Sequence, residues 1–219
     1  MQNVKIGKEI KKYDGEGKSV YLFLKRTLDI ILSSIALVIF SPIFLLLILI
    51  IKLDSKGPAL FGHKRIGKNG REISVYKFRS MVINAQEVLE NFTPEQKAEF
   101  EKNFKLENDP RITKVGSFLR KTSLDELPQL VNILKGDMSI VGPRPIVKAE
   151  IKKYGEFASK LFSVTPGLTG YWQANGRSDT TYEERVQMDM FYIDNRSLAL
   201  DIKIIFQTVA SVIKKEGAM

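Results

Sequence analysis

The chain has 219 residues, with 34 Lys and Arg against 25 Asp and Glu, one histidine and no cysteine. Disulfides, thiolate metal sites and a cysteine nucleophile are therefore excluded, as is a zinc site built from several histidines. The net charge of +9 favours anionic lipids or anionic substrates as partners, and any acid, base or nucleophile must come from carboxylates, hydroxyls, Lys or Tyr.

The length and composition predict one folded domain with a membrane segment. Residues 1–20 are polar and Lys-rich, which is typical of a flexible lead-in. Residues 21–52 contain the membrane segment, and residues 53–219 form the domain that we expect on the cytoplasmic, basic side of the membrane. We expect no cleaved signal peptide, because the apolar run begins only at Ile30 and lacks a small-residue cleavage site.

The membrane segment carries no charge from Ile30 to Ile51. At ~1.5 Å per residue, a helix of this length extends roughly 33 Å, enough to cross a bilayer core. Ser41-Pro42 lies at its centre, where Pro removes a backbone donor and should kink the helix. With cations at both ends, the helix could enter and leave by the same face; equally, it could be a kinked single span in which Ser41 caps the freed carbonyl. A buried helix of a soluble core is the least favoured alternative, because the run is too long.

Residues 59–66 and 72–78 read as strands, and Lys68-Asn69-Gly70 between them predicts a tight hairpin turn. Residues 84–106 predict a highly charged helical region, interrupted where Thr93 can cap a new helix with Gln96 three residues later. This region is most simply a solvated insertion.

A further helix is predicted to open at Ser123, with Ser123 and Glu126 as a capping box, and to close at Gly136-Asp137. Residues 165–170 predict an irregular loop. Residues 198–214 predict an amphipathic helix, which could bury its apolar face in the core or lie on the membrane.

Asp125-Glu126 is the sharpest candidate for chemistry, since adjacent carboxylates at a helix N-terminus suit an ionised Asp, bound phosphate or a metal. Ordinary helix capping explains the pair equally simply. Arg144, between two prolines, could hold a phosphate on a stiff loop or stand on a surface turn. Lys77-Phe78-Arg79 could bind a diphosphate or form an edge strand, and His63 is interpreted as a surface or turn residue.

Taken together and in this order, the motifs resemble one family, the bacterial sugar transferases, which are monotopic polyprenyl-phosphate phosphoglycosyl transferases. The resemblance covers about Tyr21 to Ile213 and rests on the broken apolar helix and four motifs: Lys77-Phe78-Arg79-Ser80-Met81, Ser123-Leu124-Asp125-Glu126-Leu127-Pro128-Gln129-Leu130, Gly142-Pro143-Arg144-Pro145 and Pro166-Gly167-Leu168-Thr169-Gly170.

The resemblance implies an α+β monotopic membrane protein. Its parts would be a re-entrant N-terminal helix broken at Ser41-Pro42, a small β-hairpin, and a helical catalytic domain with interfacial amphipathic helices at the cytoplasmic face of the inner membrane. The implied reaction moves a sugar phosphate from a UDP-sugar to undecaprenyl phosphate and releases UMP. This step begins the assembly of capsule, exopolysaccharide, O-antigen or glycoprotein glycans.

The same resemblance assigns roles to residues. Asp125 would be the nucleophile that forms a covalent phospho-sugar intermediate, and Glu126 would help to hold Mg²⁺ or handle the acceptor proton. The metal site would then comprise Asp125 and Glu126. Substrate binding is expected from the cations Lys77, Arg79, Arg120, Arg144 and Arg177.

Two other functions account for part of the sequence. A membrane-anchored basic adaptor would explain the charge and the apolar run, but not Asp125-Glu126 and the Arg144 loop in one chain. A nucleic-acid binder lacks a recognised reading module, so we expect no nucleic acid. The sequence leaves open which sugar is moved and whether the chain forms a homodimer.

Overall fold

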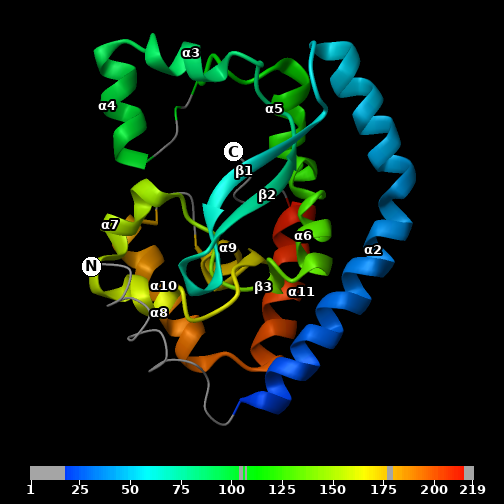
Figure 1. The fold of residues 1–219 in the computed structure, drawn as a ribbon, viewed down its shortest axis with the longest axis vertical. Helices are drawn as coiled ribbons and strands as arrows, with labels where there is room; N and C mark the ends of the chain where they lie inside the picture. Colours follow the sequence, from blue (N-terminus) through cyan, green and yellow to red (C-terminus); the bar gives the residue numbers. More distant parts are fainter. Residues whose placement is uncertain (1–17, 104–105, 107, 177–179, 215–219) are drawn as a thin grey trace.

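The computed structural model describes residues 18–103, 106, 108–176 and 180–214. Its first element, α2 (Ser19–Asp54), is a helix of 36 residues that is long and apolar enough to cross a membrane. Figure 1 shows α2 along one side of the folded part, with its first turns beside α11 (Leu198–Lys214) and its last turns beside α5 (Lys114–Lys121). The helix thus follows the whole length of the domain.

α2 continues through Pro42, so the expected interruption of the helix is not observed. Pro42 cannot donate to the carbonyl of Val38, and the Ser41 hydroxyl donates to that carbonyl instead at 2.8 Å. The capping role suggested for Ser41 is therefore confirmed. Figure 1 shows a bent helix whose convex side is turned away from the domain.

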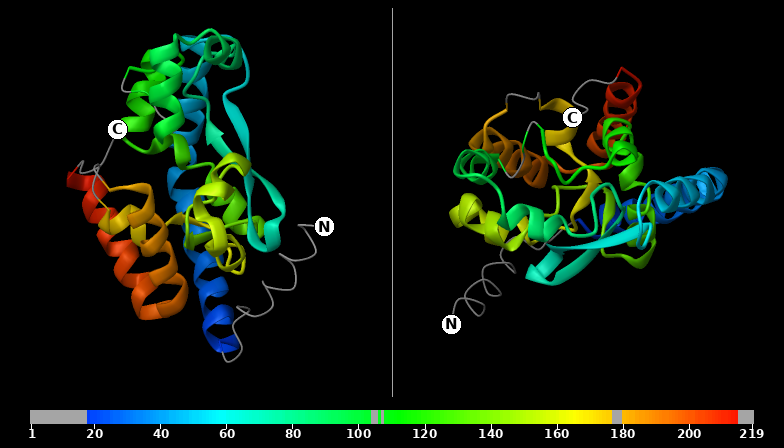
Figure 2. Two further views of the ribbon diagram at one scale, coloured as in Figure 1. Left: turned by 90° about the vertical axis from the view of Figure 1, so that its left-hand side faces the viewer. Right: turned by 90° about the horizontal axis from the view of Figure 1, so that it is seen from above.

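Both halves of α2 rest against the same domain. In the first half, the Arg26 guanidinium donates to the carbonyls of Ile133 at 2.6 Å and Leu134 at 2.8 Å. In the second half, Leu47 and Ile51 are buried in an apolar cluster. The outer face keeps its large apolar side chains exposed, and Figure 2 shows α2 projecting beyond the other elements.

The predicted hairpin is confirmed. Strand β1 (Leu60–Ile66) pairs antiparallel with β2 (Glu72–Phe78), and the short turn η1 (Lys68–Gly70) joins them. Asn69 and Gly70 both have positive φ, of 59° and 71°, a backbone conformation that these residues adopt at low cost.

The charged region forms two helices, α3 (Ala85–Glu90) and α4 (Pro94–Asn103). Thr93 caps α4 as predicted: its amide donates to Gln96 Oε1 at 3.0 Å, and its hydroxyl accepts from the Gln96 amide at 3.3 Å. Figure 1 places both helices at the edge of the domain, on the side away from α2.

The capping box predicted at Ser123 is wrong. Ser123 has φ of 56°, and its side chain makes no capping hydrogen bond. The reason is that Ser123 reverses the chain directly after α5, which leaves it in the left-handed region instead of the extended geometry of an N-cap. A single turn, η2 (Leu124–Glu126), follows, and helix α6 begins only later (Gln129–Lys135). Gly136 ends α6 with φ of 86°, as predicted.

The loop predicted at residues 165–170 contains a short strand, β4 (Gly167–Thr169), which pairs in parallel with β3 (Ser139–Val141). Sequence patterns miss such short parallel strands because they show no alternation. The remaining elements, among them the unpredicted α10, are η3 (Lys148–Glu150), α7 (Ile151–Tyr154), η4 (Gly155–Phe157), α8 (Ala158–Leu161), α9 (Tyr171–Asn175) and α10 (Tyr182–Asn195).

The largest apolar cluster lies between these helices and α11, and it includes the fully buried Tyr154, Ile193 and Ile204. The predicted amphipathic helix at 198–214 is confirmed, with Ile204 inside the core. On its other face Phe206 is 71% exposed. The core therefore occupies one face of α11, and an apolar strip on the other face remains open to a membrane or to solvent.

Candidate active site

Asp125 and Glu126 lie in the turn η2, at the junction of α5 and α6. The Asp125 residue is 6% exposed. Its side chain receives no hydrogen bond from another residue in the described part of the chain, although a buried carboxylate normally finds donors. The pair lies in this single 3-10 turn, shortly before α6 begins at Gln129.

Lys77, at the end of β2, brings a positive charge to both carboxylates. Its ammonium nitrogen lies 2.5 Å from Glu126 Oε1 and 3.8 Å from Asp125 Oδ2. The hairpin and the α5–α6 junction are far apart in sequence, so the structure brings together two motifs that the sequence presents separately. Lys77 is well placed to share its charge between the carboxylates and an anionic substrate.

The two carboxyl groups respond oppositely to this environment. Burial raises the pKa of Asp125; the charge of Glu126 adds to the rise, while Lys77 and Arg120 oppose it. Burial alone would raise the pKa of Glu126 too, but Lys77 and Arg144 outweigh it and lower the pKa of Glu126. Adjacent carboxyl groups with opposite pKa shifts are typical of sites where the two take different chemical roles.

Arg120 is held beside Asp125 by a close approach between α5 and the end of the hairpin. Its Nε donates to Ser80 Oγ at 2.9 Å. At Gly116, on the same helix, an added Cβ would stand 2.0 Å from the Ser80 carbonyl oxygen, so only glycine lets α5 come this near. The Ser80 hydroxyl thus orients a guanidinium whose charge acts on Asp125.

Arg144 stands on the loop after β3, held by contacts between two of the motifs. The Gly142 amide donates to the Thr169 carbonyl at 2.8 Å, and the Gly167 amide donates to the Pro143 carbonyl at 2.9 Å. Arg144 is half-buried, and its charge lowers the pKa of Glu126. Within the described residues its guanidinium has no hydrogen-bond or ion-pair partner, which leaves it available to an anion.

Arg79, another predicted substrate contact, is directed away from this site. The Arg79 guanidinium donates to the Ser55 carbonyl at 2.7 Å, to its hydroxyl at 3.1 Å and to the Lys56 carbonyl at 2.5 Å. This placement favours a structural role for Arg79, at the C-terminal end of α2. Arg177 lies outside the described residues, so its substrate contact stays a prediction.

A second charged cluster was not found from the sequence. The buried Glu150 lies 3.4 Å from Arg65 and 3.6 Å from Arg185, and it accepts from the Tyr182 hydroxyl at 3.3 Å. Burial and the charge of Arg144 lower the pKa of Arg65 to about 10, which places Arg144 beside this cluster. No spacing pattern relates these residues, because they come from β1, η3 and α10.

His63 differs from the expected surface or turn residue. It is half-buried in β1, opposite Val75 on β2. Burial, with the charges of Arg65 and Lys77, lowers the pKa of His63 to about 4. The imidazole is therefore neutral near pH 7, and it belongs to the positively charged surroundings of the active site.

The donor set suits Mg²⁺ only in company with a substrate. The described residues contain no cluster of three or more His, Asp or Glu side chains that could hold a metal by itself. Mg²⁺ usually takes one or two carboxylates and completes its shell with phosphate oxygens and waters. Asp125 and Glu126 fit that requirement.

Comparison with known proteins identifies the family. Residues 20–215 match the bacterial sugar transferase family. The chain is 51% identical over 199 residues to the undecaprenyl-phosphate galactose phosphotransferase of Salmonella typhimurium, covering 90% of the chain and 42% of that protein. It is 47% identical over 199 residues to the UDP-galactose-lipid carrier transferase of Erwinia amylovora, with the same coverage of 90% and 42%.

A third relative is similar in length. The chain is 46% identical over 197 residues to the exopolysaccharide production protein ExoY of Rhizobium meliloti, covering 89% of the chain and 87% of that protein. The Salmonella and Erwinia proteins are more than twice as long as the region they share with this chain, which spans 42% of each. The match includes α2, the hairpin and every motif on which the resemblance rests, and the chain belongs to the bacterial sugar transferase family.

Proposed function

We propose that this chain transfers a sugar phosphate from a UDP-sugar to undecaprenyl phosphate, with release of UMP. The observation that carries the proposal is the Asp125 carboxylate, which is buried, poorly hydrogen-bonded and 3.8 Å from Lys77. The names of the Salmonella and Erwinia relatives supply the substrate class and make UDP-galactose the first donor to test. A basic adaptor would have no use for such a carboxylate.

The reaction has two displacements at phosphorus. An Asp125 oxygen attacks the phosphorus bonded to the sugar, the bond to the bridging oxygen breaks, and UMP leaves with the electron pair. An oxygen of undecaprenyl phosphate then attacks the resulting aspartyl phosphate, which frees the carboxylate and forms a lipid diphosphate sugar. A carboxylate with a raised pKa is the better nucleophile once ionised, which suits Asp125 for the first displacement.

The cations supply most of the remaining catalysis. Phosphoryl transfer depends mainly on positioning and on neutralising charge on the phosphate oxygens. Lys77, Arg120 and Arg144 surround the two carboxylates and would receive the diphosphate. Asp125 and Glu126 would hold Mg²⁺, which when bound supplies further neutralisation of the diphosphate charge.

The contacts of α2 support a re-entrant arrangement, and the excess of cations favours the cytoplasmic face for the domain. Lys25 near its start lies 2.9 Å from Asp201, and Ser55 just after its end bonds Arg79, so both ends are tied to one polar domain. A helix that crossed the bilayer would place its ends on opposite faces, about 30 Å apart. The bend of α2, which contains Pro42, has its convex side outward (Figure 1), and this shape suits a helix that dips into one leaflet and returns.

UMP release with purified full-length protein, undecaprenyl phosphate and a panel of UDP-galactose, UDP-glucose and UDP-N-acetylgalactosamine tests the reaction. We expect release with at least one donor; no release with any of them would reject the transferase function. Intact-protein mass spectrometry after mixing with donor alone tests the intermediate. Turnover without a rise by one sugar phosphate would reject the covalent step and leave the overall transfer standing.

Cysteine labelling tests the topology, because the chain has no native cysteine. Single substitutions Lys18→Cys and Lys56→Cys place a thiol at each end of α2. With an impermeant maleimide, we expect both to react from the cytoplasmic side only. Labelling of the two positions from opposite sides would show a single span.

A further inference from the structure

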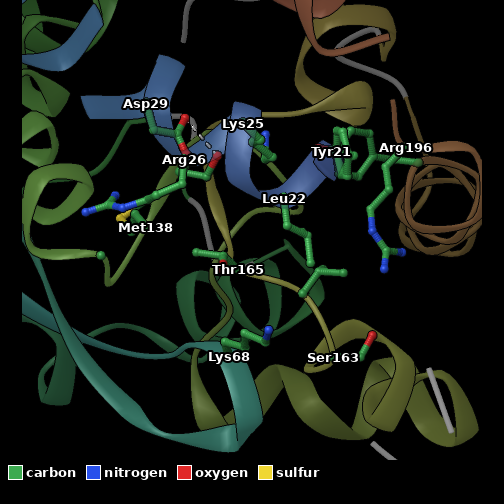
Figure 3. A pocket seen from close by; sticks show the side chains of 14 residues that line it. Tyr21, Leu22, Lys25, Arg26, Asp29, Lys68, Met138, Ser163, Thr165 and Arg196 are labelled. Carbon is green, nitrogen blue, oxygen red and sulfur yellow. Dashed lines mark hydrogen bonds between the residues drawn. The ribbon is translucent and has the colours of Figure 1, made fainter. Parts of the chain in front are cut away.

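A cavity of about 120 Å³ lies at the N-terminal end of α2 (Figure 3). Its walls come from the first turns of α2, the hairpin turn η1, the start of β3, the loop before β4 and the end of α10. A buried water needs only ~10–15 Å³ of such space, so this cavity has room for a group of phosphate size.

The cavity is separate from the active site. None of Asp125, Glu126, Lys77 or Arg144 lines it. Lys68, which does, lies at the turn of the hairpin, whereas Lys77 lies near the opposite end of β2. The strand steps from Glu72 to Lys77 alone span about 17 Å at ~3.3 Å each. A ligand phosphate in the cavity is therefore out of reach of the reacting carboxylates.

The cavity is positively charged. One carboxylate lines it, Asp29, together with four cations: Lys25, Arg26, Lys68 and Arg196. Lys25 also forms an ion pair with Asp201, which does not itself line the cavity. Counting both carboxylates, a net charge of +2 remains in and around this space.

Arg196 lines the cavity with unused hydrogen-bonding capacity. Its Nη1 donates to the Ile193 carbonyl, but its Nε is buried and has no partner among the described residues. Figure 3 shows its side chain extending past Leu22 toward Ser163. A buried guanidinium N–H without an acceptor is costly, and an anion in the cavity would relieve that cost.

The cavity adjoins the apolar face of α2. Leu22 lines it and is 42% exposed, and the neighbouring Val20 and Phe23 are 73% and 71% exposed. An anion carried on apolar chains could place its charge in the cavity and its chains along these residues. We propose that the cavity binds the headgroup phosphate of an anionic phospholipid and so fixes the height of the domain on the membrane.

The test is native mass spectrometry of the full chain in detergent, titrated with phosphatidylglycerol. The double variant Lys68→Gln/Arg196→Gln should bind it about tenfold more weakly, because two cations near the headgroup are lost. The matched control Arg71→Gln/Lys152→Gln removes the same kinds of charge from exposed positions that do not line the cavity, and it should bind like the unmodified chain.

A second variant, Thr165→Phe, fills the cavity without changing charge and should weaken binding similarly; a thermal melt shows that each variant is folded. Equal affinities of the double variant and its control would overturn the proposal, as would equal affinities for phosphatidylcholine and phosphatidylglycerol. If inorganic phosphate displaced the lipid at equal concentration, the ligand would be a free anion and the lipid assignment would be wrong.

Discussion

Two buried carboxylates, one at each end of the domain, show how differently this chain treats the same side chain. Asp201, 4% exposed, joins α11 to α2 and α10 and accepts from Lys25 at 2.9 Å, Tyr21 at 3.0 Å and Tyr192 at 2.8 Å. Asp125, 6% exposed, has Lys77 at 3.8 Å and receives no hydrogen bond from another described residue.

The difference separates a structural carboxylate from a reactive one. The three donors offset the cost of burying the Asp201 carboxylate, so this charge holds α2, α10 and α11 together. Asp125 is buried, and few donors offset the cost of removing its carboxylate from water. Burial therefore raises its pKa, and its oxygens are left available for reaction. A buried carboxylate that receives few hydrogen bonds and has a raised pKa is typical of a position that serves chemistry.

The largest expected effect is on Asp125. Asp125→Asn should reduce UMP release at least ~10³-fold, because the amide cannot form the aspartyl phosphate. Its thermal unfolding temperature should stay the same or rise, since a poorly satisfied buried charge is removed. UMP release and a thermal melt on one preparation measure both. Full activity in this variant would remove Asp125 from the mechanism.

Asp201→Asn is the matched substitution at the structural carboxylate. In contrast to Asp125→Asn, it should lower stability. Loss of the charge leaves Lys25 partly buried without its partner, which should lower the free energy of unfolding by about 2–4 kcal/mol. Chemical denaturation measures the loss. Adding Lys25→Met should recover part of it, because both partners are then apolar or neutral. A stability loss at Asp125 as large as at Asp201 would break the comparison.

The features predicted from sequence are those that depend on neighbouring residues. The turn at Asn69-Gly70, the cap at Thr93 and the end of α6 at Gly136 each need only a few adjacent residues, and all three are confirmed. Ser123 has the spacing of an N-cap but directly follows Thr122, the C-cap of α5, in a left-handed conformation. Thr93 and Ser123 share the same local pattern of a cap. They differ in what precedes them, because Ser123 comes directly after the end of α5.

The parts that could not be predicted depend on distant segments. Arg79 lies in a motif that suggests phosphate binding, but its partners are carbonyls at the end of α2. Glu150 collects Arg65 and Arg185 from elements far apart in the chain. The adjacency of Asp125 and Glu126 was visible in the sequence. The burial that raises the pKa of Asp125, and the charges of Lys77 and Arg144 that lower the pKa of Glu126, come only from the fold.

Lys77→Met would sharpen the account of Asp125. Lys77 opposes the rise in the pKa of Asp125, so its removal should raise that pKa further. The acidic limb of the pH profile of kcat/KM should move up by about one pH unit, with activity at pH 8 reduced about 10–100-fold. Lys77→Arg keeps the charge and should keep the limb in place. An unmoved limb in Lys77→Met would show that another group titrates there.

The smallest expected effect is at His63. It tests whether the surroundings of the active site make the free energy of unfolding depend on pH. Its pKa is lowered to about 4 by burial and by Arg65 and Lys77, so the unfolded chain binds a proton more readily than the folded one. The stability associated with neutral His63 is full above pH ~6.5 and is lost as the pH falls toward 4. His63→Gln cannot titrate, so between pH 7 and 5 its free energy of unfolding should fall by about 1 kcal/mol less than that of the unmodified chain, allowing for solvent screening of the half-buried ring. Denaturation curves at the two pH values measure the difference. Parallel losses in both chains would show that neither burial nor the nearby cations lower the pKa of His63 in the folded chain. The contrast between the two ends of the domain would then rest on the carboxylates alone.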